Sequence, residues 1–317
     1  MKVHFWGTRG SIPVSLNSEQ VRAKIIRVLR MARGLRLETD AEIFKFVDER
    51  LPFISRGTYG GNTSCVELMG GREIILCDAG SGLKDFGQSI LSGDKEETGT
   101  INIFISHLHW DHLQGFPFFR PAYLPGYRIN IFGCHEELEK AFMNQQAPMN
   151  FPVSLKEMKA DISFKVLREA REYEVGGFKV TPKKQQHPGD SYGYRFVLGD
   201  RSVVYSTDAE HSADLNSIEK EFVKFISGAD LMIYDAQYCF AEATVFKEHW
   251  GHSSNILGVE QALKAGVKRL VLFHSDPLKS DEMLEKILSD TWEYQKICDD
   301  KSPMAIELAY DGLEIEL

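Results

Sequence analysis

Short runs of β-branched and aromatic residues recur along the chain and predict a protein rich in β-strands. The expected strands are residues 2–6, 64–68, 73–77, 101–105, 128–132, 178–182, 193–198, 202–206, 230–234 and 269–273. Apolar residues at helical spacing appear in residues 135–145, 214–226, 254–266 and 280–296. Residues 304–317 hold two alternating segments around Asp311 and Gly312, which is a strong hairpin signal. The chain therefore begins as mostly β-structure and continues as β/α units.

Residues 15–54 interrupt this pattern near the N-terminus, and their spacing predicts two helices. The apolar positions are Val21, Ile25, Leu29 and Ala32 in the first helix and Ile43, Phe46 and Val47 in the second. A capping box formed by Thr39 and Glu42 would begin the second helix. The two helices are either a hairpin packed on the scaffold, or a lid or oligomer contact beside a functional site.

The composition is that of an ordinary soluble globular protein. With 43% hydrophobic and 26% charged residues, a chain of 317 residues can bury a sizeable core. No repeat, low-complexity tract or long linker marks a second domain, so we expect one domain over residues 1–317 that carries the insertion at 15–54. The net charge of -9 argues against a broad basic face for long nucleic acid, but it is compatible with a small anionic substrate.

The cysteines and the apolar runs indicate where the protein works. The five cysteines are widely spaced and form no CxxC pair, which suggests reduced thiols. No run approaches the roughly 18 to 20 apolar residues that a membrane span needs. We therefore expect a cytoplasmic protein with no membrane partner.

The segment SHLHWDH, residues 106–112, directly follows the apolar run 101–105 and concentrates metal-binding side chains. Alternate residues of an extended segment face the same way, so His107 and His109 project together. The turn that follows can bring Asp111 and His112 to a second point nearby, and one loop could serve two adjacent metals. Imidazole and carboxylate ligands suit zinc, with manganese or iron as alternatives.

Six residues cannot complete two metal sites, so further ligands should follow later strands. His187, Asp208 and His274 each close, or nearly close, an apolar strand. Taken singly, each could be a turn residue. Taken together in the same context, they favour a site.

With Asp78 in ILCDAGSG, these motifs resemble the metallo-β-lactamase superfamily, in the same order and over nearly the whole chain. The resemblance implies an α/β fold, a four-layer αββα sandwich with a dinuclear site at the edge of the two sheets. This sequence departs from the compact members by its helical insertion near the N-terminus, residues 15–54. It implies that Asp208 bridges the metals and that Asp78, otherwise a turn residue before Gly80, orients a ligand histidine. The implied ligands are His107, His109 and His187 for one metal and Asp111, His112 and His274 for the other.

Two later motifs, YDAQY and GHSS, are similar to the ribonuclease Z branch and to related bacterial cyclic-nucleotide phosphodiesterases. In that branch an acidic residue pairs with a histidine that protonates the leaving oxygen, and the matching residues are Asp235 and His252. A carboxylate partner would raise the pKa of the histidine and fix its tautomer. On the sequence alone, His252 could also be a histidine in the turn before a helix.

The N-terminal blocks GTRGSIP and YGGNTSCVE resemble those of small bacterial and phage enzymes that open cyclic nucleotides, including the anti-Pycsar proteins. The resemblance also implies a homodimer. The polar residues of these blocks would either offer donors near a phosphate or support the site loops through turns and buried hydrogen bonds. They are Arg9, Asn62, Thr63 and Ser64.

The favoured function is a phosphodiesterase that hydrolyses a 3',5'-cyclic mononucleotide through a hydroxide bridging two divalent metal ions, with Asp111, His252 and Asp235 as catalytic residues. The metals would be Zn²⁺, or alternatively Mn²⁺ or Fe²⁺. A ribonuclease Z-like tRNA 3'-end endonuclease is an alternative, although the acidic balance and the lack of a basic, glycine-rich arm count against it.

Two other classes stay open. One is another hydrolase of the same fold, and the other is a non-catalytic nucleotide sensor, which the open ligand pattern disfavours because structural zinc sites are usually closed by four protein ligands. A GxSxG nucleophile elbow and a GxxxxGK[ST] phosphate loop are both absent from the sequence, so neither a serine hydrolase nor a nucleoside triphosphatase is indicated.

Overall fold

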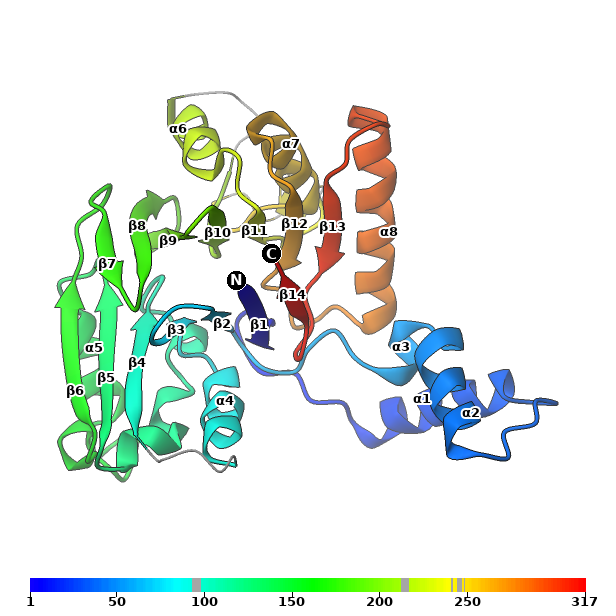
Figure 1. The fold of residues 1–317 in the computed structure, drawn as a ribbon, viewed down its shortest axis with the longest axis horizontal. Helices are drawn as coiled ribbons and strands as arrows, with labels where there is room; N and C mark the ends of the chain where they lie inside the picture. The colour runs from blue at the N-terminus through cyan, green and yellow to red at the C-terminus, as the bar shows by residue number, and fades with distance from the viewer. Residues whose placement is uncertain (93–97, 212–216, 241, 244–246, 248) are drawn as a thin grey trace.

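A computed structural model describes residues 1–92, 98–211, 217–240, 242–243, 247 and 249–317. In this part of the chain two seven-stranded sheets have the orders β14-β1-β2-β3-β4-β5-β6 and β13-β12-β11-β10-β9-β8-β7 (Figure 1). The first sheet consists of β1 (Lys2–Gly7), β2 (Cys65–Met69), β3 (Ile74–Cys77), β4 (Gly99–Phe104), β5 (Tyr127–Gly133), β6 (Asp161–Val166) and β14 (Glu314–Glu316). The second consists of β7 (Tyr173–Val175), β8 (Phe178–Gln185), β9 (Ser191–Leu198), β10 (Arg201–Ser206), β11 (Leu231–Asp235), β12 (Arg269–Phe273) and β13 (Ala305–Leu308).

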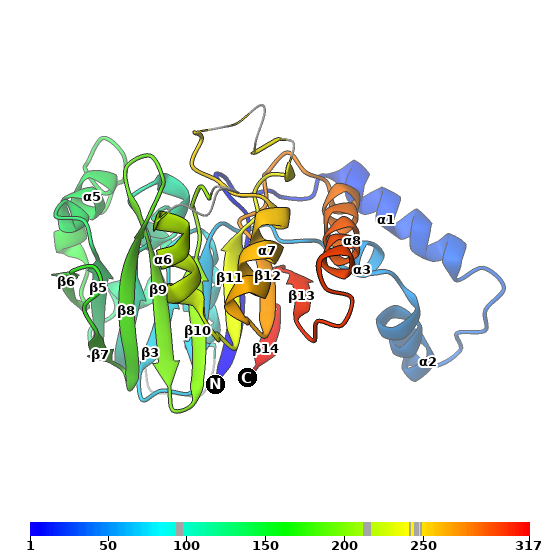
Figure 2. The same ribbon diagram turned by 90° about the horizontal axis from the view of Figure 1, so that it is seen from above.

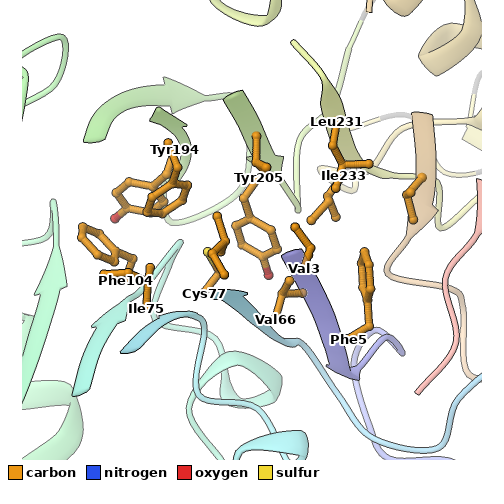
Figure 3. Close-up of a cluster of buried hydrophobic side chains, with 14 of the residues drawn as sticks. Val3, Phe5, Val66, Ile75, Cys77, Phe104, Tyr194, Tyr205, Leu231 and Ile233 are labelled. Atoms are coloured by element: carbon orange, nitrogen blue, oxygen red, sulfur yellow. The ribbon is translucent and has the colours of Figure 1, made fainter. Parts of the chain in front are cut away.

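The core between the sheets follows from alternation along the strands. In β1 every second residue is buried, which places Val3 and Phe5 on the inner face. Figure 3 shows these side chains with Phe104 of the first sheet, facing Tyr194 and Tyr205 of the second. Each large side chain that is fully buried contributes about 1.5–3 kcal/mol relative to an exposed one. The two inner faces therefore hold the strand ends in fixed relative positions.

Helices cover the outer face of each sheet (Figures 1 and 2). Helices α4 (Gly82–Leu91) and α5 (Leu138–Gln145) pack on the first sheet, and α6 (Ser217–Ile226), α7 (Asn255–Ala265) and α8 (Asp281–Cys298) on the second. The side chains of Ser254 and Ser280 cap α7 and α8 by accepting backbone N–H groups. Short 3₁₀ segments complete the connections: η2 (Trp110–His112), η3 (Phe116–Phe118), η4 (Arg120–Tyr123) and η5 (Leu155–Glu157). The order helix, sheet, sheet, helix confirms the predicted αββα fold.

Parallel pairing determines where the loops of the site meet. Strands β3, β4 and β5 are parallel to one another, and so are β10, β11 and β12. The carboxyl ends of parallel strands lie at the same edge of a sheet, so the loops that follow them come together. The segments with Asp78, His107, Asp208, Asp235 and His274 are such loops or strand ends.

The predicted C-terminal hairpin is wrong. Strand β13 pairs in parallel with β12 in the second sheet, whereas β14 pairs antiparallel with β1 in the first. The turn between them crosses from one sheet to the other. The Asp311 carboxylate is held there by the Thr8 hydroxyl at 3.0 Å and the N–H groups of Gly61 and Asn62 at 2.9 and 2.8 Å. These long-range partners override the local turn signal.

Several elements differ from the sequence prediction, and among them helix α4 was not predicted. Strands β6 and β7 were not predicted, because most of their side chains are partly or fully exposed and give no apolar run. The helix expected at 214–226 is present from Ser217 onward, and its first predicted residues lie outside the described residues. Within the described residues, no helix combines the length and the apolar character needed to span a membrane.

Both helices predicted in the insertion are present, at the side of the molecule beyond α8 (Figures 1 and 2). The elements are α1 (Ser18–Met31), α2 (Asp40–Lys45), the π-helical turn η1 (Phe46–Arg50) and α3 (Phe53–Arg56). The predicted capping box of Thr39 and Glu42 is confirmed. Lys24 joins α1 to the body, because its Nζ donates to the carbonyls of Ile54 and Gly57 and to the Asp281 carboxylate at 2.6–2.8 Å.

Replacing Lys24 with Met should loosen the insertion. The change removes three hydrogen bonds that Lys24 donates, one of them to a buried carboxylate. We therefore expect the free energy of unfolding to fall by about 1–3 kcal/mol. Thermolysin should then cut residues 15–54 faster. Lys286→Met is the matched control, since Lys286 pairs only with exposed Asp290 on α8. Equal cleavage and unfolding of the two variants would contradict the anchoring role of Lys24.

Candidate metal centre

Four loops bring seven metal-binding side chains together at the common edge of the sheets. Within the described residues, four overlapping groups have possible ligand atoms within 4.8 Å of one another, and two of the four contain His252. The other two groups consist of His107, His109 and His187, and of Asp111, His112, Asp208 and His274. These are the residues that the sequence predicted as ligands. The second group is buried throughout, whereas His109 is exposed and His187 half-buried. A substrate would therefore approach from the side of His109 and His187.

The Asp208 carboxylate lies between the two groups. Its Oδ1 is 3.2 Å from His112 Nε2 and 3.3 Å from His274 Nε2. Its Oδ2 is 3.6 Å from His107 Nε2 and 3.9 Å from His187 Nε2. Each oxygen thus faces one set of imidazoles, the arrangement that a carboxylate shared by two cations requires.

Two imidazole nitrogens that lack hydrogen-bond partners among the described residues indicate that the residues of this site fit metal ions. In the described part of the chain, the buried Nε2 atoms of His107 and His112 have no hydrogen-bond partner. Buried polar atoms of this kind normally have partners, and an unpaired one costs about 1–3 kcal/mol. Both atoms point toward Asp208, where a cation would satisfy them.

The charges of the site also favour cations. Burial lowers the pKa of His107, His109 and His187, so these imidazoles are neutral and available as ligands. Burial opposes ionisation of Asp111, but the neighbouring His112 and His274 outweigh it and lower the pKa of the carboxyl group. Burial lowers the pKa of His112, but Asp111, Asp208 and Asp78 outweigh burial and raise it, so a cation bound by this imidazole would displace its proton.

Asp78 orients the loop that follows β4 and carries the first four candidate ligands. Its fully buried carboxylate accepts hydrogen bonds from the Ser106 N–H at 2.7 Å, the Ser106 hydroxyl at 2.8 Å, the Tyr205 hydroxyl at 2.6 Å and His112 Nδ1 at 2.7 Å. With Nδ1 of His112 donating to this carboxylate, Nε2 is left facing Asp208. Such partners fix the tautomer and the ring orientation of a ligating histidine.

Other ligands are oriented by residues that the sequence analysis missed. His187 Nδ1 donates to the carbonyl of Gly251 at 2.7 Å, and His274 Nδ1 lies 3.2 Å from Gln237 Oε1. Glu210 holds the loop of Gly251, since its carboxylate accepts the N–H groups of His249 and Gly251 at 2.7 and 3.0 Å. Gln237 and Gly251 lay within motifs that the sequence singled out, as the fourth residue of YDAQY and the first residue of GHSS, but neither was assigned a role.

The backbone is strained where the loops leave the strands. Asp78, Asp208 and His274 have positive φ angles of 62°, 47° and 60°. A non-glycine residue in this left-handed region costs of order 1–3 kcal/mol. Gly10 packs against the ring of His274 so closely that a Cβ atom would lie 2.6 Å from its Cε1. The geometry of the strand ends is thus maintained by the surrounding packing.

The pair predicted from YDAQY and GHSS borders the same cluster. His252 Nδ1 is 2.9 Å from the fully buried Asp235 carboxylate, and the His252 ring stacks on His274 with centroids 5.3 Å apart. Burial lowers the pKa of His252, but Asp235 outweighs that effect and raises it to about 9. At neutral pH His252 is therefore a protonated imidazolium beside the candidate ligands.

The polar residues of the N-terminal blocks are used inside the protein. Arg9 is 2% exposed, and its guanidinium donates to the carbonyls of Gly60, Asp276 and Lys279. Asn62 and Thr63 exchange hydrogen bonds with Ser81, and Ser64 is fully buried. The alternative that these residues support the loops fits these contacts better than donation to a phosphate. Their link to the centre is the N–H of Ser11, which donates to Asp111 Oδ2 at 2.8 Å.

Comparisons with known proteins agree with this fold. Residues 73–275 match the model of the beta-lactamase superfamily domain. A ribonuclease Z of Oceanobacillus iheyensis is 21% identical over 268 residues, which cover 69% of this chain and 84% of that protein. Among solved structures, the metallo-beta-lactamase fold protein YhfI from Bacillus subtilis aligns with a TM-score of 0.63 at 19% identity, over 99% of each chain. A diphosphatase from the PhnP family aligns with a TM-score of 0.61 at 20% identity, over 100% of this chain and 97% of that one.

The family match covers more than half of the chain and includes all seven candidate ligands together with Asp78, Asp235 and His252. The remaining features, the paired sheets and the two ligand groups, agree with a metal-dependent hydrolase. This chain belongs to the beta-lactamase superfamily.

Proposed function

We propose that this protein is a dinuclear metal-dependent phosphodiesterase that hydrolyses a small cyclic nucleotide, a 3',5'-cyclic mononucleotide. The observation that carries the proposal is the pair of Asp235 and His252, joined at 2.9 Å and set against the ligand groups. An alkoxide leaving group needs a proton, whereas the hydrolysis of a thioester has a much less basic leaving group. A protonated histidine beside the centre serves a phosphate ester of ribose.

The candidate ligands would form two metal sites, one on the side of each Asp208 oxygen. His107, His109 and His187 would hold one metal, Asp111, His112 and His274 the other, and Asp208 would bridge them. Zn²⁺ suits these nitrogen and oxygen donors, and Mn²⁺ or Fe²⁺ are alternatives. When bound, two such cations supply an activated water and neutralise charge on the phosphoryl oxygens.

His252 supplies the proton at the other end of the reaction. Its Nδ1–H is held by Asp235, so the proton to be transferred is the one on Nε2. As the bond between phosphorus and the ribose oxygen breaks, that oxygen takes the Nε2 proton and leaves as a hydroxyl group. Asp235 keeps the ring oriented, because its carboxylate is itself held in place by the N–H groups of Ala209 and Gln237.

A ribonuclease Z-like tRNA 3'-end endonuclease is the second candidate. The match with the ribonuclease Z of Oceanobacillus iheyensis favours it, and the same histidine could protonate the leaving ribose oxygen of an RNA chain. The net charge of -9 favours a small substrate, because gripping a long polyanion depends on many basic contacts. The two candidates share the metal ligands and differ in what the surface around them binds.

Hydrolysis of a panel of cyclic mononucleotides, a cyclic dinucleotide and a precursor tRNA tests this proposal. The wild-type protein should open cyclic mononucleotides most efficiently, and His252→Ala should lower kcat by about 10²–10⁴-fold, the usual contribution of a general acid. Metal content, measured by mass spectrometry, should not change. His4→Ala is the control, since His4 pairs with Glu314 at the edge of the first sheet. Higher efficiency on precursor tRNA would reverse the order of the two candidates.

The pH profile tests the role of Asp235. His252 must be protonated to act, so kcat should fall as the pH rises through its pKa of about 9. Asp235→Asn removes the negative charge that raises this pKa, and the alkaline limb of kcat should move to lower pH, toward the ordinary imidazole value of about 6.5. An alkaline limb that stays in place in Asp235→Asn would show that another group controls it.

Metal stoichiometry tests the division of the ligands. Asp208→Ala should abolish binding of both ions, because the carboxylate would serve both. His274→Ala should weaken one ion selectively, by at least about 10-fold, and leave the site of His107 and His109 filled. Titration with Zn²⁺ after chelation, followed by calorimetry, measures both changes. Two intact sites in Asp208→Ala would contradict the bridging assignment.

A further inference from the structure

The insertion exposes apolar side chains on two of its helices. Neither α1 nor α2 contains a buried residue. The exposed fraction is 54% for Ile25, 65% for Leu29 and 65% for Phe44. Val21 and Ile43 extend these stripes at 41% and 40%. Contiguous apolar surface of this kind marks an interaction site in a folded protein.

The two stripes have borders of opposite charge. Residues 18–36, which contain α1, include six basic residues and one acidic residue. Residues 38–49, which contain α2 and most of η1, include five acidic residues and one basic residue. Arg30 and Arg33 are exposed in the first segment, and Asp48 and Glu49 in the second. One insertion therefore carries a basic apolar face and an acidic apolar face.

Two of the basic side chains form ion pairs with the body of the molecule. Lys24 and Arg27 bind Asp281 and Glu282 at the start of α8, both at 2.7 Å. Within the described residues, no ion pair joins the basic segment to the acidic segment. The ion pair between Lys45 and Glu49 lies entirely inside the acidic segment. The complementary faces are thus not satisfied by each other in a single chain.

We propose that the insertion is a dimerisation arm through which two copies of this chain pair, α1 of one copy lying against α2 and η1 of the other. In a two-fold symmetric interface each patch meets its complement twice, so a basic face and an acidic face on the same arm complement each other in both places. The pairing covers both apolar stripes and brings opposite charges together. It is independent of the proposed catalytic activity.

A second copy explains the two faces together, and an anionic partner does not. RNA or an anionic lipid surface would attract the arginines of α1 but would be repelled by the acidic border of α2. Ile43 and Phe44 would then stay uncovered. The place of α1 and α2 beyond α8 leaves the arm accessible to another copy (Figure 2).

Sedimentation velocity of the full chain over a range of concentrations tests the pairing. The wild-type protein should form a dimer, and Leu29→Asp should weaken it at least about tenfold, because a charge would replace a buried apolar contact. Ile297→Asp is the matched control, since Ile297 is 80% exposed on α8, outside the arm. A wild-type protein that is monomeric at every concentration, or a dimer that Leu29→Asp leaves unchanged, would overturn the proposal.

Charge reversal tests the register of the two faces and does not depend on one substitution. Arg30→Glu with Arg33→Glu should give a monomer, and so should Asp48→Lys with Glu49→Lys. An equimolar mixture of these two variants should recover a dimer, because each reversed face then meets its opposite. Failure of the mixture to associate would refute the pairing. Monomeric wild-type protein that binds polyuridylate RNA through Arg30 and Arg33 would replace the second copy with a polyanion.

Discussion

A carboxylate buried between two sets of imidazoles is the interaction on which this molecule depends. Asp208 is 2% exposed, and each of its oxygens faces a different group of histidines. An ion removed from water costs several kcal/mol unless opposite charge surrounds it, so the loops have to keep their positive or metal-binding partners in register. The parallel strands supply that register, since their carboxyl ends bring residues distant in the sequence to one edge.

The centre is supported in successive steps, from the cores of the sheets through Asp78 to the candidate ligands. The cores between and outside the sheets fix the strands, and Asp78 connects them to the first loop through Ser106, His112 and Tyr205. The Nε2 atoms of His107 and His112 face Asp208 and have no hydrogen-bond partner among the described residues. The exposed side of His109 and His187 then remains as the approach for a substrate, with His252 at its border.

The sequence was informative wherever function concentrates several residue types in one short segment. SHLHWDH predicted a ligand loop, and the ends of later apolar runs located His187, Asp208 and His274 in the same cluster. The roles of Gln237 and Glu210 could not be predicted, because they depend on loops that meet only in the folded chain. The hairpin failed for the same reason, since β13 and β14 each pair with a strand of a different sheet.

Gly251 connects the candidate ligand His187 to the proposed proton donor His252. Its carbonyl orients His187, its N–H is held by Glu210, and the next residue is His252. Its φ of 84° and the 2.4 Å that would separate a Cβ from His187 Nδ1 exclude any other residue without rearrangement. A change at Gly251 would therefore disturb a candidate metal ligand and the proposed proton donor together.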